Sequence, residues 1–312
     1  MLLQKIKTFI KGMSPKPIRT FLQAKRENQI SRKAPTITKH RIKEDLRKLG
    51  LAKGDIVFLH SSLKSIGYVK GGAATVIDAI IEVLDSSGTL IIPTFSMKKS
   101  IYDTCMDKAY IFDPQKTGTM LGIIPSTFLG YPNIYRSIHP THSVSAVGKH
   151  AGYITEAHHL APSIFGSDSP WDRLMKLDGK IFALGLKMGR NTFSHVLEDR
   201  MSDQFPLPVR MQESYLLKCK NWEGNIIEVP VTPFDPKLKK VRMDQDKRKD
   251  LREYFWEEFT RAGILKVGKI GQATSWLASA NEYYDHLTAL MREGITIYSS
   301  SEELKRRPLC RV

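Results

Sequence analysis

The stretch DIVFLHSSLKSIGYVKGGAATVIDAIIEVLDSSGTLIIP, residues 55–93, decides the fold class. Its first six residues form a short apolar run that predicts a buried strand. A polar loop follows, and Gly71-Gly72 then precede a helical pattern from Ala73 to Leu84. Gly88 introduces a second buried strand over residues 89–93. A strand, a loop, a helix and a strand in this order predict a βαβ unit and hence an α/β fold.

Further elements extend this unit in both directions. The segment 98–143 is rich in polar, proline and aromatic residues, and we expect a substrate loop there, with a helix only at 118–129. Residues 208–235 alternate around a turn at 222–225, which predicts an antiparallel hairpin inserted in or appended to the α/β domain. The remaining predicted elements are a strand at 180–185 and helices at 41–50, 192–200 (capped by Thr192 or Ser194), 251–262 and 281–292.

The charge of the chain is concentrated at its ends. The 312 residues include 48 Lys and Arg against 32 Asp and Glu, a net charge of +16. Residues 1–43 hold 12 basic residues and one acid, a net +11, and residues 302–312 add +2, which leaves +3 for the rest. We therefore expect a basic N-terminal extension (1–40), one catalytic domain (41–301) and a basic C-terminal tail (302–312).

The N-terminal extension is amphipathic, because Leu2, Leu3, Ile6, Phe9 and Ile10 recur at helical spacing between lysines. Two interpretations stay open: a solvated or self-packing helix, and peripheral contact of residues 1–30 with an anionic membrane surface. The apolar stretches are too short for a membrane span or a secretory signal. No aromatic platform accompanies the charge, so we expect no nucleic-acid partner. The expected location is cytoplasmic, at the inner face of the membrane if the extension binds lipid.

The cysteines and two histidines give no metal or disulfide signature. Cys105, Cys219 and Cys310 are far apart and lack the spacing of a disulfide scaffold or zinc site, so we expect inert thiols. His139 and His142 are three residues apart, but Pro140 between them favours a rigid loop over a metal site. We expect no metal cofactor.

Two segments are candidates for chemistry. The loop His60 to Gly67, with Gly71-Gly72 downstream, has the hydroxyls and helix N-terminus that receive phosphate groups, although it has neither the Rossmann nor the Walker spacing. His195 and Glu198 lie three residues apart, which places both on one helix face, where a carboxylate can orient an imidazole as a general base. A structural role is the alternative for each segment.

These segments belong to an ordered set of motifs: HSSLKSIG (60–67), Val69 and Gly71-Gly72; FDP (112–114) and TGT (117–119); His139-Pro140 and SVSAVG (143–148); GSDSP (166–170); Leu184-Gly185; His195 with Glu198; and GKIGQA (268–273). The set resembles the aminoglycoside 3-N-acetyltransferase family over roughly residues 41–290. That resemblance implies a mixed central sheet with flanking helices, distinct from the GNAT fold, and acetyl-CoA as cosubstrate.

The resemblance also implies roles for individual residues. His195 would deprotonate the acceptor amine and Glu198 would orient it, with Asp199, Asp203 and Asp113 as alternative partners. Thr119, Ser62 or a backbone N–H would stabilise the oxyanion. The expected cofactor-binding residues are Ser62, Leu63, Lys64, Ser65, Val69, Gly71, Gly72, Thr119 and Ser143, and the expected substrate-binding residues are Asp113, Lys187 and Arg190.

The acceptor is expected to be a small-molecule amino sugar. Lys187 and Arg190 precede His195 and suit an anionic group, which favours a nucleotide-linked amino sugar for surface polysaccharide. The alternatives are an aminoglycoside, with antibiotic resistance as the outcome, and a non-catalytic relative that binds membranes or polyanions. The presence of both His195 and the Ser62 loop favours an enzyme, acting as a monomer or homodimer.

Overall fold

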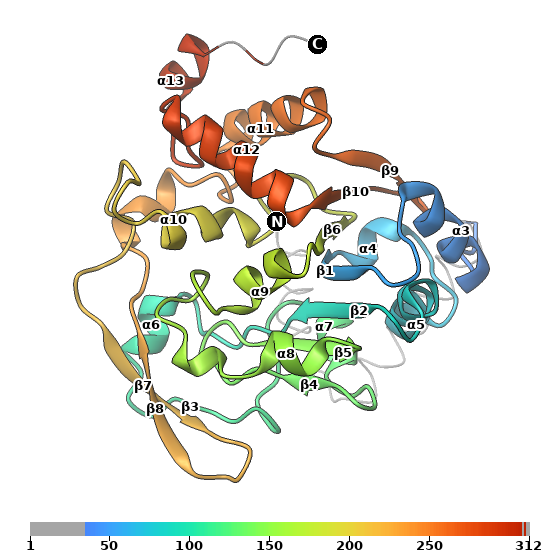
Figure 1. Cartoon of the computed structure of the whole chain (residues 1–312), viewed down its shortest axis with the longest axis horizontal. Helices are drawn as coiled ribbons and strands as arrows, with labels where there is room; N and C mark the ends of the chain where they lie inside the picture. Colours follow the sequence, from blue (N-terminus) through green and yellow to red (C-terminus); the bar gives the residue numbers. More distant parts are fainter. Residues whose placement is uncertain (1–34, 308, 310–312) are drawn as a thin grey trace, which may run out of the picture.

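The computed structural model describes residues 35–307 and 309. Its centre is a seven-stranded mixed sheet in the order β4-β5-β2-β1-β6-β10-β9 (Figure 1). The strands are β1 (Ile56–Ser61), β2 (Thr89–Pro93), β4 (Tyr135–Arg136), β5 (Val144–Gly148), β6 (Lys180–Leu184), β9 (Lys266–Ile270) and β10 (Ala273–Ser279). Strands β2, β1 and β6 are parallel, whereas β5 and β10 join them antiparallel. The expected α/β class with a mixed sheet is confirmed.

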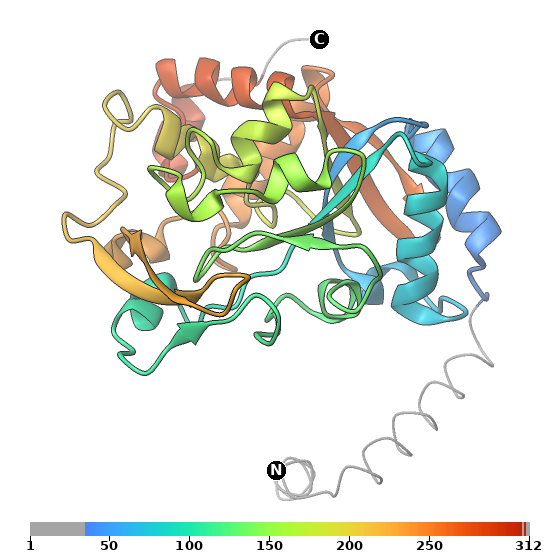
Figure 2. The same ribbon diagram turned by 60° about the horizontal axis from the view of Figure 1, so that its bottom comes forward.

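The sheet separates two hydrophobic cores. Strand β1 alternates between them: Val57 and Leu59 face one core, and Phe58 faces the other. The first core is covered by α3 (Lys39–Leu49), α5 (Gly72–Leu84) and α7 (Ile123–Phe128). The second is covered by α8 (Ala151–Thr155), α9 (Pro170–Lys176), α10 (Val196–Arg200), α11 (Lys249–Arg261) and α12 (Ala280–Arg292). Figures 1 and 2 show α3 and α5 side by side at one end of the molecule.

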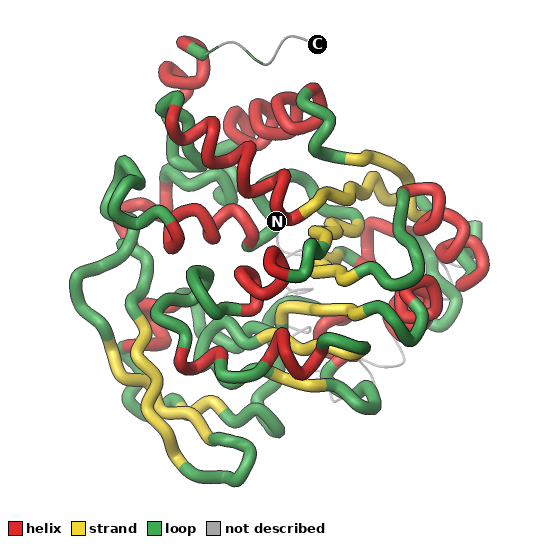
Figure 3. The backbone as a smooth tube through the Cα atoms, viewed as in Figure 1, coloured by secondary structure: helices red, strands yellow, loops and turns green. Residues whose placement is uncertain are grey.

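A second, three-stranded sheet lies beside this body. It has the order β3-β7-β8, formed by β3 (Ile111–Phe112), β7 (Tyr215–Lys220) and β8 (Ile226–Val231). Strands β7 and β8 form the expected antiparallel hairpin, seen at the lower left of Figures 1 and 3. The helix expected at 118–129 is shorter, because Gly122 adopts a positive φ and α7 begins only at Ile123. The segment 98–143 also contains α6 (Ile101–Cys105), β3 and β4, so it is more structured than a loop.

The two ends of the described chain pack on the domain. Ile37 forms a parallel bridge with Val69, and Thr38 caps α3. At the other end, α13 (Ser301–Arg306) begins with a capping box at Ser300, and Arg307 forms an ion pair with the buried Glu258. Residues 35–40 and 301–307 thus contact the body that was expected to span 41–301. The expectations about residues 1–34 and Cys310 lie outside the described residues.

The buried residues also bear on the cysteines and on membrane insertion. Cys105 and Cys219 are free and buried, and burial raises the pKa of their thiols to about 11 and about 12. These thiols therefore stay protonated near neutral pH. Every helix within the described residues is too short or too polar to cross a bilayer. The remaining elements are α4 (Leu63–Ile66) and the 3₁₀ turns η1 (His158–Leu160), η2 (Phe193–His195) and η3 (Pro236–Lys240).

Candidate active site

The candidate site lies where the three parallel strands end. Because β1, β2 and β6 run in the same direction, the loops after Ser61, Pro93 and Leu184 emerge at one edge of the sheet. Gly185 allows two of these loops to touch. It has a positive φ, and a Cβ there would stand 2.7 Å from the Cβ of Ser65. Such an edge is where α/β proteins place their ligands.

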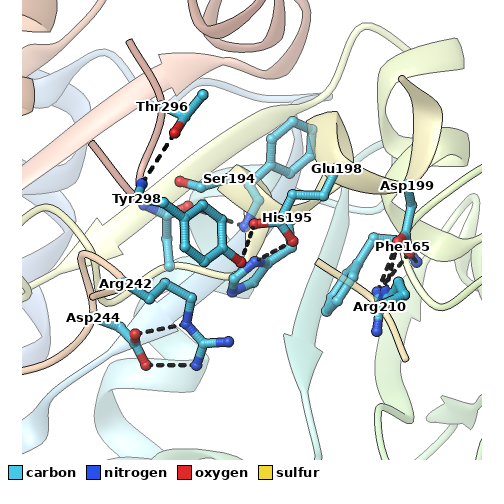
Figure 4. A network of polar contacts seen from close by, with 12 residues as sticks. Phe165, Ser194, His195, Glu198, Asp199, Arg210, Arg242, Asp244, Thr296 and Tyr298 are labelled. Carbon is cyan, nitrogen blue, oxygen red and sulfur yellow. Dashed lines mark hydrogen bonds and ion pairs between the residues drawn. The ribbon is translucent and has the colours of Figure 1, made fainter. Parts of the chain in front are cut away.

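His195 ends the η2 turn of the loop that follows β6, and α10 continues from it. Its Nδ1 lies 3.0 Å from Oε2 of Glu198 on the next turn (Figure 4). The expected helix at 192–200 is thus a 3₁₀ turn followed by a five-residue helix. Neither expected side-chain cap is present, because the Thr192 hydroxyl accepts a hydrogen bond from the Trp171 indole, at 3.1 Å, and the Ser194 hydroxyl contacts the Tyr283 hydroxyl.

Glu198 has a second partner that comes from the far end of the chain. The Tyr298 hydroxyl donates to Oε1 of Glu198 at 2.8 Å. The Glu198 side chain is fully buried, and burial together with the Glu198 charge raises the pKa of Tyr298 far above its ordinary value. Tyr298 therefore remains a donor at all physiological pH values. The two hydrogen bonds fix both carboxylate oxygens, one on the imidazole and one on the phenol.

The other carboxylates near His195 in the sequence are engaged elsewhere. Asp199 is buried and forms a bidentate pair with Arg210, with N–O distances of 2.8 Å (Figure 4). Asp203 is exposed. Asp113 accepts from the backbone of its own turn and lies 3.4 Å from Lys220. Of the four carboxylates that could orient His195, only Glu198 contacts the imidazole.

The His195 imidazole lines a cavity of about 440 Å³. The Phe165 and Phe234 rings flank it, with centroids 5.3 and 4.9 Å from the imidazole. Since Nδ1 is held by Glu198, Nε2 is the nitrogen available to a ligand. A second cavity of about 310 Å³ borders Glu198 and Asp199. Because His195 lines the first cavity and not the second, the first is the candidate for the chemistry.

Side chains of both signs line the His195 cavity. The acids are Asp103, Asp235 and Asp244, and the cations are Lys99, Arg190, Lys239 and Arg242. Arg242 and Asp244 form a bidentate pair at 2.7 and 2.9 Å. Burial opposes ionisation of Asp244, but the Arg242 hydrogen bonds outweigh it and hold the pKa of Asp244 below its ordinary value. Arg242 and Asp244 are thus both charged, and their charges cancel each other.

The two cations expected to bind substrate occupy different positions. Lys187 is exposed and does not line either cavity. Arg190 does line the His195 cavity, but its guanidinium is paired with Asp246 at 2.7 Å. Asp113 is outside both cavities. The reason for predicting an anionic acceptor from Lys187 and Arg190 is therefore weakened, because nearness in sequence did not place both charges in the site.

The expected cofactor loop lies at the same edge of the sheet. Ser62 and Ser65 hydroxyls are hydrogen-bonded at 2.9 Å, Leu63 is half-buried and Lys64 is exposed. Gly71 and Gly72 open α5 with positive φ values. Val69 is buried in the first core.

Two hydroxyls expected to bind the cofactor or the oxyanion are engaged by the protein. Thr119 donates to the Phe95 carbonyl at 2.9 Å. Ser143 is fully buried and donates to the Thr94 carbonyl at 2.8 Å, so it is not accessible to coenzyme A. The structure therefore gives no support to Ser143 as a cofactor contact, and that role stays a prediction.

The loop from His139 to His142 is buried. Both histidines are buried, and His139 stacks on His158 at 4.5 Å. Within residues 35–307, no three His, Cys, Asp or Glu side chains are grouped as metal ligands. His142 lines the same cavity as His195.

The fold and this site define a class: an α/β enzyme with a carboxylate-held histidine at the strand ends, outside the GNAT fold. Comparison with known proteins names the family. A profile described as aminoglycoside 3-N-acetyltransferase matches residues 58–292. The chain therefore belongs to the aminoglycoside 3-N-acetyltransferase family. It is a coenzyme A-dependent acyltransferase, and acetyl-CoA is its cosubstrate.

Individual relatives agree with this assignment. The chain is 31% identical to the SPbeta prophage-derived aminoglycoside N(3')-acetyltransferase-like protein YokD of Bacillus subtilis (strain 168), over 80% of this chain and 90% of the relative. It is 29% identical to aminoglycoside N(3)-acetyltransferase III of Serratia marcescens, over 77% and 92% of the two chains. The crystal structure of aminoglycoside acetyltransferase AAC(3)-Xa matches with a TM-score of 0.72 at 27% identity, over 88% and 99%.

The sequence did not indicate several residues of the site. Tyr298 lies a hundred positions from Glu198 and beyond the residues matched by the family profile. Phe165, Phe234 and Arg242 come from loops without a recognisable motif. Of the residues that line the cavity with His195, His142 alone stood in a noticeable sequence pattern, the His-Pro-Thr-His run. That pattern raised the possibility of a metal ligand and did not point to a hydrogen-bond donor in the active site.

Proposed function

We propose that this enzyme transfers the acetyl group of acetyl-CoA to the 3-amino group of an aminoglycoside, with His195 as general base. The observation that carries the mechanism is the His195–Glu198–Tyr298 hydrogen-bonded chain, whose His195 end lines the 440 Å³ cavity. The relatives named as aminoglycoside N(3)-acetyltransferases support the acceptor. They favour it over the nucleotide-linked amino sugar expected from Lys187 and Arg190.

The reaction is a direct transfer in a ternary complex. An ammonium group must lose a proton before its nitrogen can attack, and His195 Nε2 accepts that proton. Glu198 stabilises the resulting imidazolium through Nδ1. The amine lone pair then forms the C–N bond, the C–S bond breaks, and the thiolate leaves with its electron pair. The nitrogen, which carries a positive charge after the attack, releases its second proton to solvent. The imidazolium returns the proton to the thiolate, which gives an amide and a free thiol.

The loop 62–65 and the N-terminus of α5 are the proposed contacts for coenzyme A. Hydroxyls of Ser62 and Ser65 and the backbone N–H groups after Gly71 are donors suited to pantetheine and pyrophosphate. Their position supports this role, because Ser65 touches Gly185 in the loop that leads to His195. A cofactor bound along this edge would direct its thioester toward the His195 cavity.

An acceptor panel tests the proposal. Thiol release from acetyl-CoA is measured with an aminoglycoside bearing a free 3-amino group and with the same compound acetylated at that nitrogen. We expect turnover with the first and a loss of at least about 100-fold with the second, because the nucleophile is blocked. Equal rates with both compounds would place the acetylation at another nitrogen and contradict the regiochemistry.

A second acceptor class is favoured by one observation. Lys99 and Lys239 line the cavity, and neither forms an ion pair among residues 35–307. These cations suit an amino sugar linked to a phosphate-bearing carrier such as a nucleotide. Asp103 and Asp235, equally without an ion pair in the described part of the chain, suit a polycation.

Variants that neutralise the acids or the lysines of the cavity separate the two classes of acceptor. If the acceptor is an aminoglycoside, the double variant Asp103→Asn, Asp235→Asn raises its KM about tenfold, and Lys99→Met, Lys239→Met leaves KM equal or lower. The reverse pattern with a nucleotide-linked amino sugar would establish the second class and overturn the first.

A further inference from the structure

His142 enters the catalytic cavity from a different loop than His195. It lies between β4 and β5, and its ring packs against Phe95 at 4.3 Å and Phe165 at 5.1 Å. Phe165 also packs against His195, so one aromatic ring separates the two imidazoles. Both histidines line the same cavity. The mechanism above gives His142 no role.

The hydrogen bonds around His142 assign its tautomer. The backbone N–H groups of Thr141 and His142 both donate to Nδ1 of His139, at 3.2 and 3.0 Å. That nitrogen is therefore an acceptor that is already occupied, and the Thr141 hydroxyl is 3.4 Å from it. The hydroxyl lies closer, at 2.9 Å, to Nδ1 of His142, and we assign it as the donor there. The proton of His142 is then on Nε2.

The surroundings keep His142 uncharged. Its ring is almost completely buried, and no carboxylate contacts it among the described residues. Burial lowers the pKa of His142 well below the ordinary value, and the nearby charges of Arg210, His195, His158 and Arg242 lower it further. A neutral imidazole of this tautomer is a hydrogen-bond donor whose strength does not change across physiological pH.

The loop that carries His142 is anchored on both sides. Arg136 is buried and donates to the carbonyls of Thr94 and Pro114 and to the Ser143 hydroxyl. Ser143 in turn donates to the Thr94 carbonyl. Pro140 restricts the backbone of the same loop. His142 is therefore held in place before any substrate arrives, as a preorganised electrostatic donor must be.

We propose that Nε2–H of His142 donates to the thioester carbonyl oxygen and stabilises the negative charge that develops there during transfer. The inference rests on the proposed acetyl transfer. As the amine forms the C–N bond, the carbonyl π pair moves to oxygen, and His142 donates to this oxyanion. When the pair returns to carbon, the C–S bond breaks and the thiolate leaves. His142 neither gains nor loses a proton, so its role is separate from that of His195.

Two substitutions isolate the donor from the ring. His142→Phe preserves an aromatic ring between Phe95 and Phe165 but has no donor. His142→Gln places an amide nitrogen close to the original Nε2. We expect His142→Phe to lower kcat about 100-fold with KM for acetyl-CoA within about threefold, because the donor acts on the transition state. His142→Gln should recover at least a tenth of wild-type kcat. His150→Gln, a histidine outside both cavities, is the matched control.

Three readouts make each outcome decisive. Thermal unfolding and coenzyme A binding show whether a variant is folded. Nitrogen-15 NMR of labelled wild-type enzyme should show His142 protonated at Nε2 and unchanged between pH 6 and 9; a proton on Nδ1 would overturn the inference. So would a folded His142→Phe variant with kcat within about threefold of wild type, or a loss confined to KM. His195→Ala is measured in parallel, because its retention of activity would instead contradict the proposed function.

Discussion

Two imidazoles face the same cavity but differ in what holds Nδ1. In His195 the partner is the buried carboxylate of Glu198, whereas in His142 it is the hydroxyl of Thr141. A carboxylate stabilises a ring that becomes positively charged, so His195 suits proton transfer. A hydroxyl offers no such charge, and a buried ring that it orients stays neutral and donates. In the proposed mechanism, one type of side chain thus has two electrostatic roles, set by its nearest partner.

Removing the charge of the carboxylate should abolish the difference between the two rings. We expect Glu198→Gln to lower kcat by about 100-fold or more, because the amide cannot stabilise an imidazolium and Tyr298 then faces a poorer acceptor. Steady-state thiol release measures the effect. Asp203→Asn, which neutralises an exposed carboxylate nearby, should retain activity. Equal losses in the two variants would show that only net charge matters.

A smaller effect should follow from removing the second hydrogen bond on Glu198. In Tyr298→Phe the carboxylate loses its phenol donor, so more of its negative charge acts on His195. We expect kcat to fall five- to tenfold and the acid limb of the pH–rate profile to move to higher pH. Tyr153→Phe, on the surface near Arg173, serves as the control. A profile that does not move would limit Tyr298 to packing.

The neutral state of buried histidines without a carboxylate can be tested by stability. His60 is buried, its Nε2 has no hydrogen-bond partner among the described residues, and burial lowers the pKa of His60 to about 3. In the unfolded chain this ring takes up a proton below about pH 6.5, whereas the folded protein resists until about pH 3. As the pH is lowered from about 6.5 to about 3, the free energy of unfolding should therefore decrease, by up to about 1.4 kcal/mol per pH unit for each such group.

Chemical denaturation of His60→Leu between pH 6 and 4.5 measures this contribution. The pH dependence of the unfolding free energy should be smaller in His60→Leu than in wild type, by about 1.4 kcal/mol per pH unit. An unchanged slope would mean that His60 is protonated in the folded state. His150→Leu, at a partly exposed histidine, is the control.

The sequence predicted the parts of the fold and site that depend on local pattern. The apolar runs at 55–60 and 89–93 became β1 and β2, and the three-residue spacing of His195 and Glu198 became a hydrogen bond, because both depend on nearby residues. Tyr298 could not be predicted in this way. Its contact with Glu198 depends on how α12 and the following loop return to the sheet edge.

Three predicted site residues gain no support from the structure, for a related reason. Lys187 and Arg190 are close to His195 in sequence, but one is exposed outside the cavities and the other is paired with Asp246. Ser143 belongs to the expected motif, yet Arg136 and the Thr94 carbonyl engage its hydroxyl. A sequence shows which donors and charges exist. Packing decides which of them are already hydrogen-bonded or ion-paired within the protein.

The most direct test of the central claim is the pH dependence of His195→Ala. If His195 removes a proton from the acceptor ammonium, the variant should lose about 1,000-fold in kcat/KM at pH 7. Its rate should then rise with pH as the free amine becomes abundant, approaching wild type only where the acceptor is already deprotonated. A folded variant with wild-type activity at pH 7, or a deficit that is constant at every pH, would contradict the role of His195 as the base.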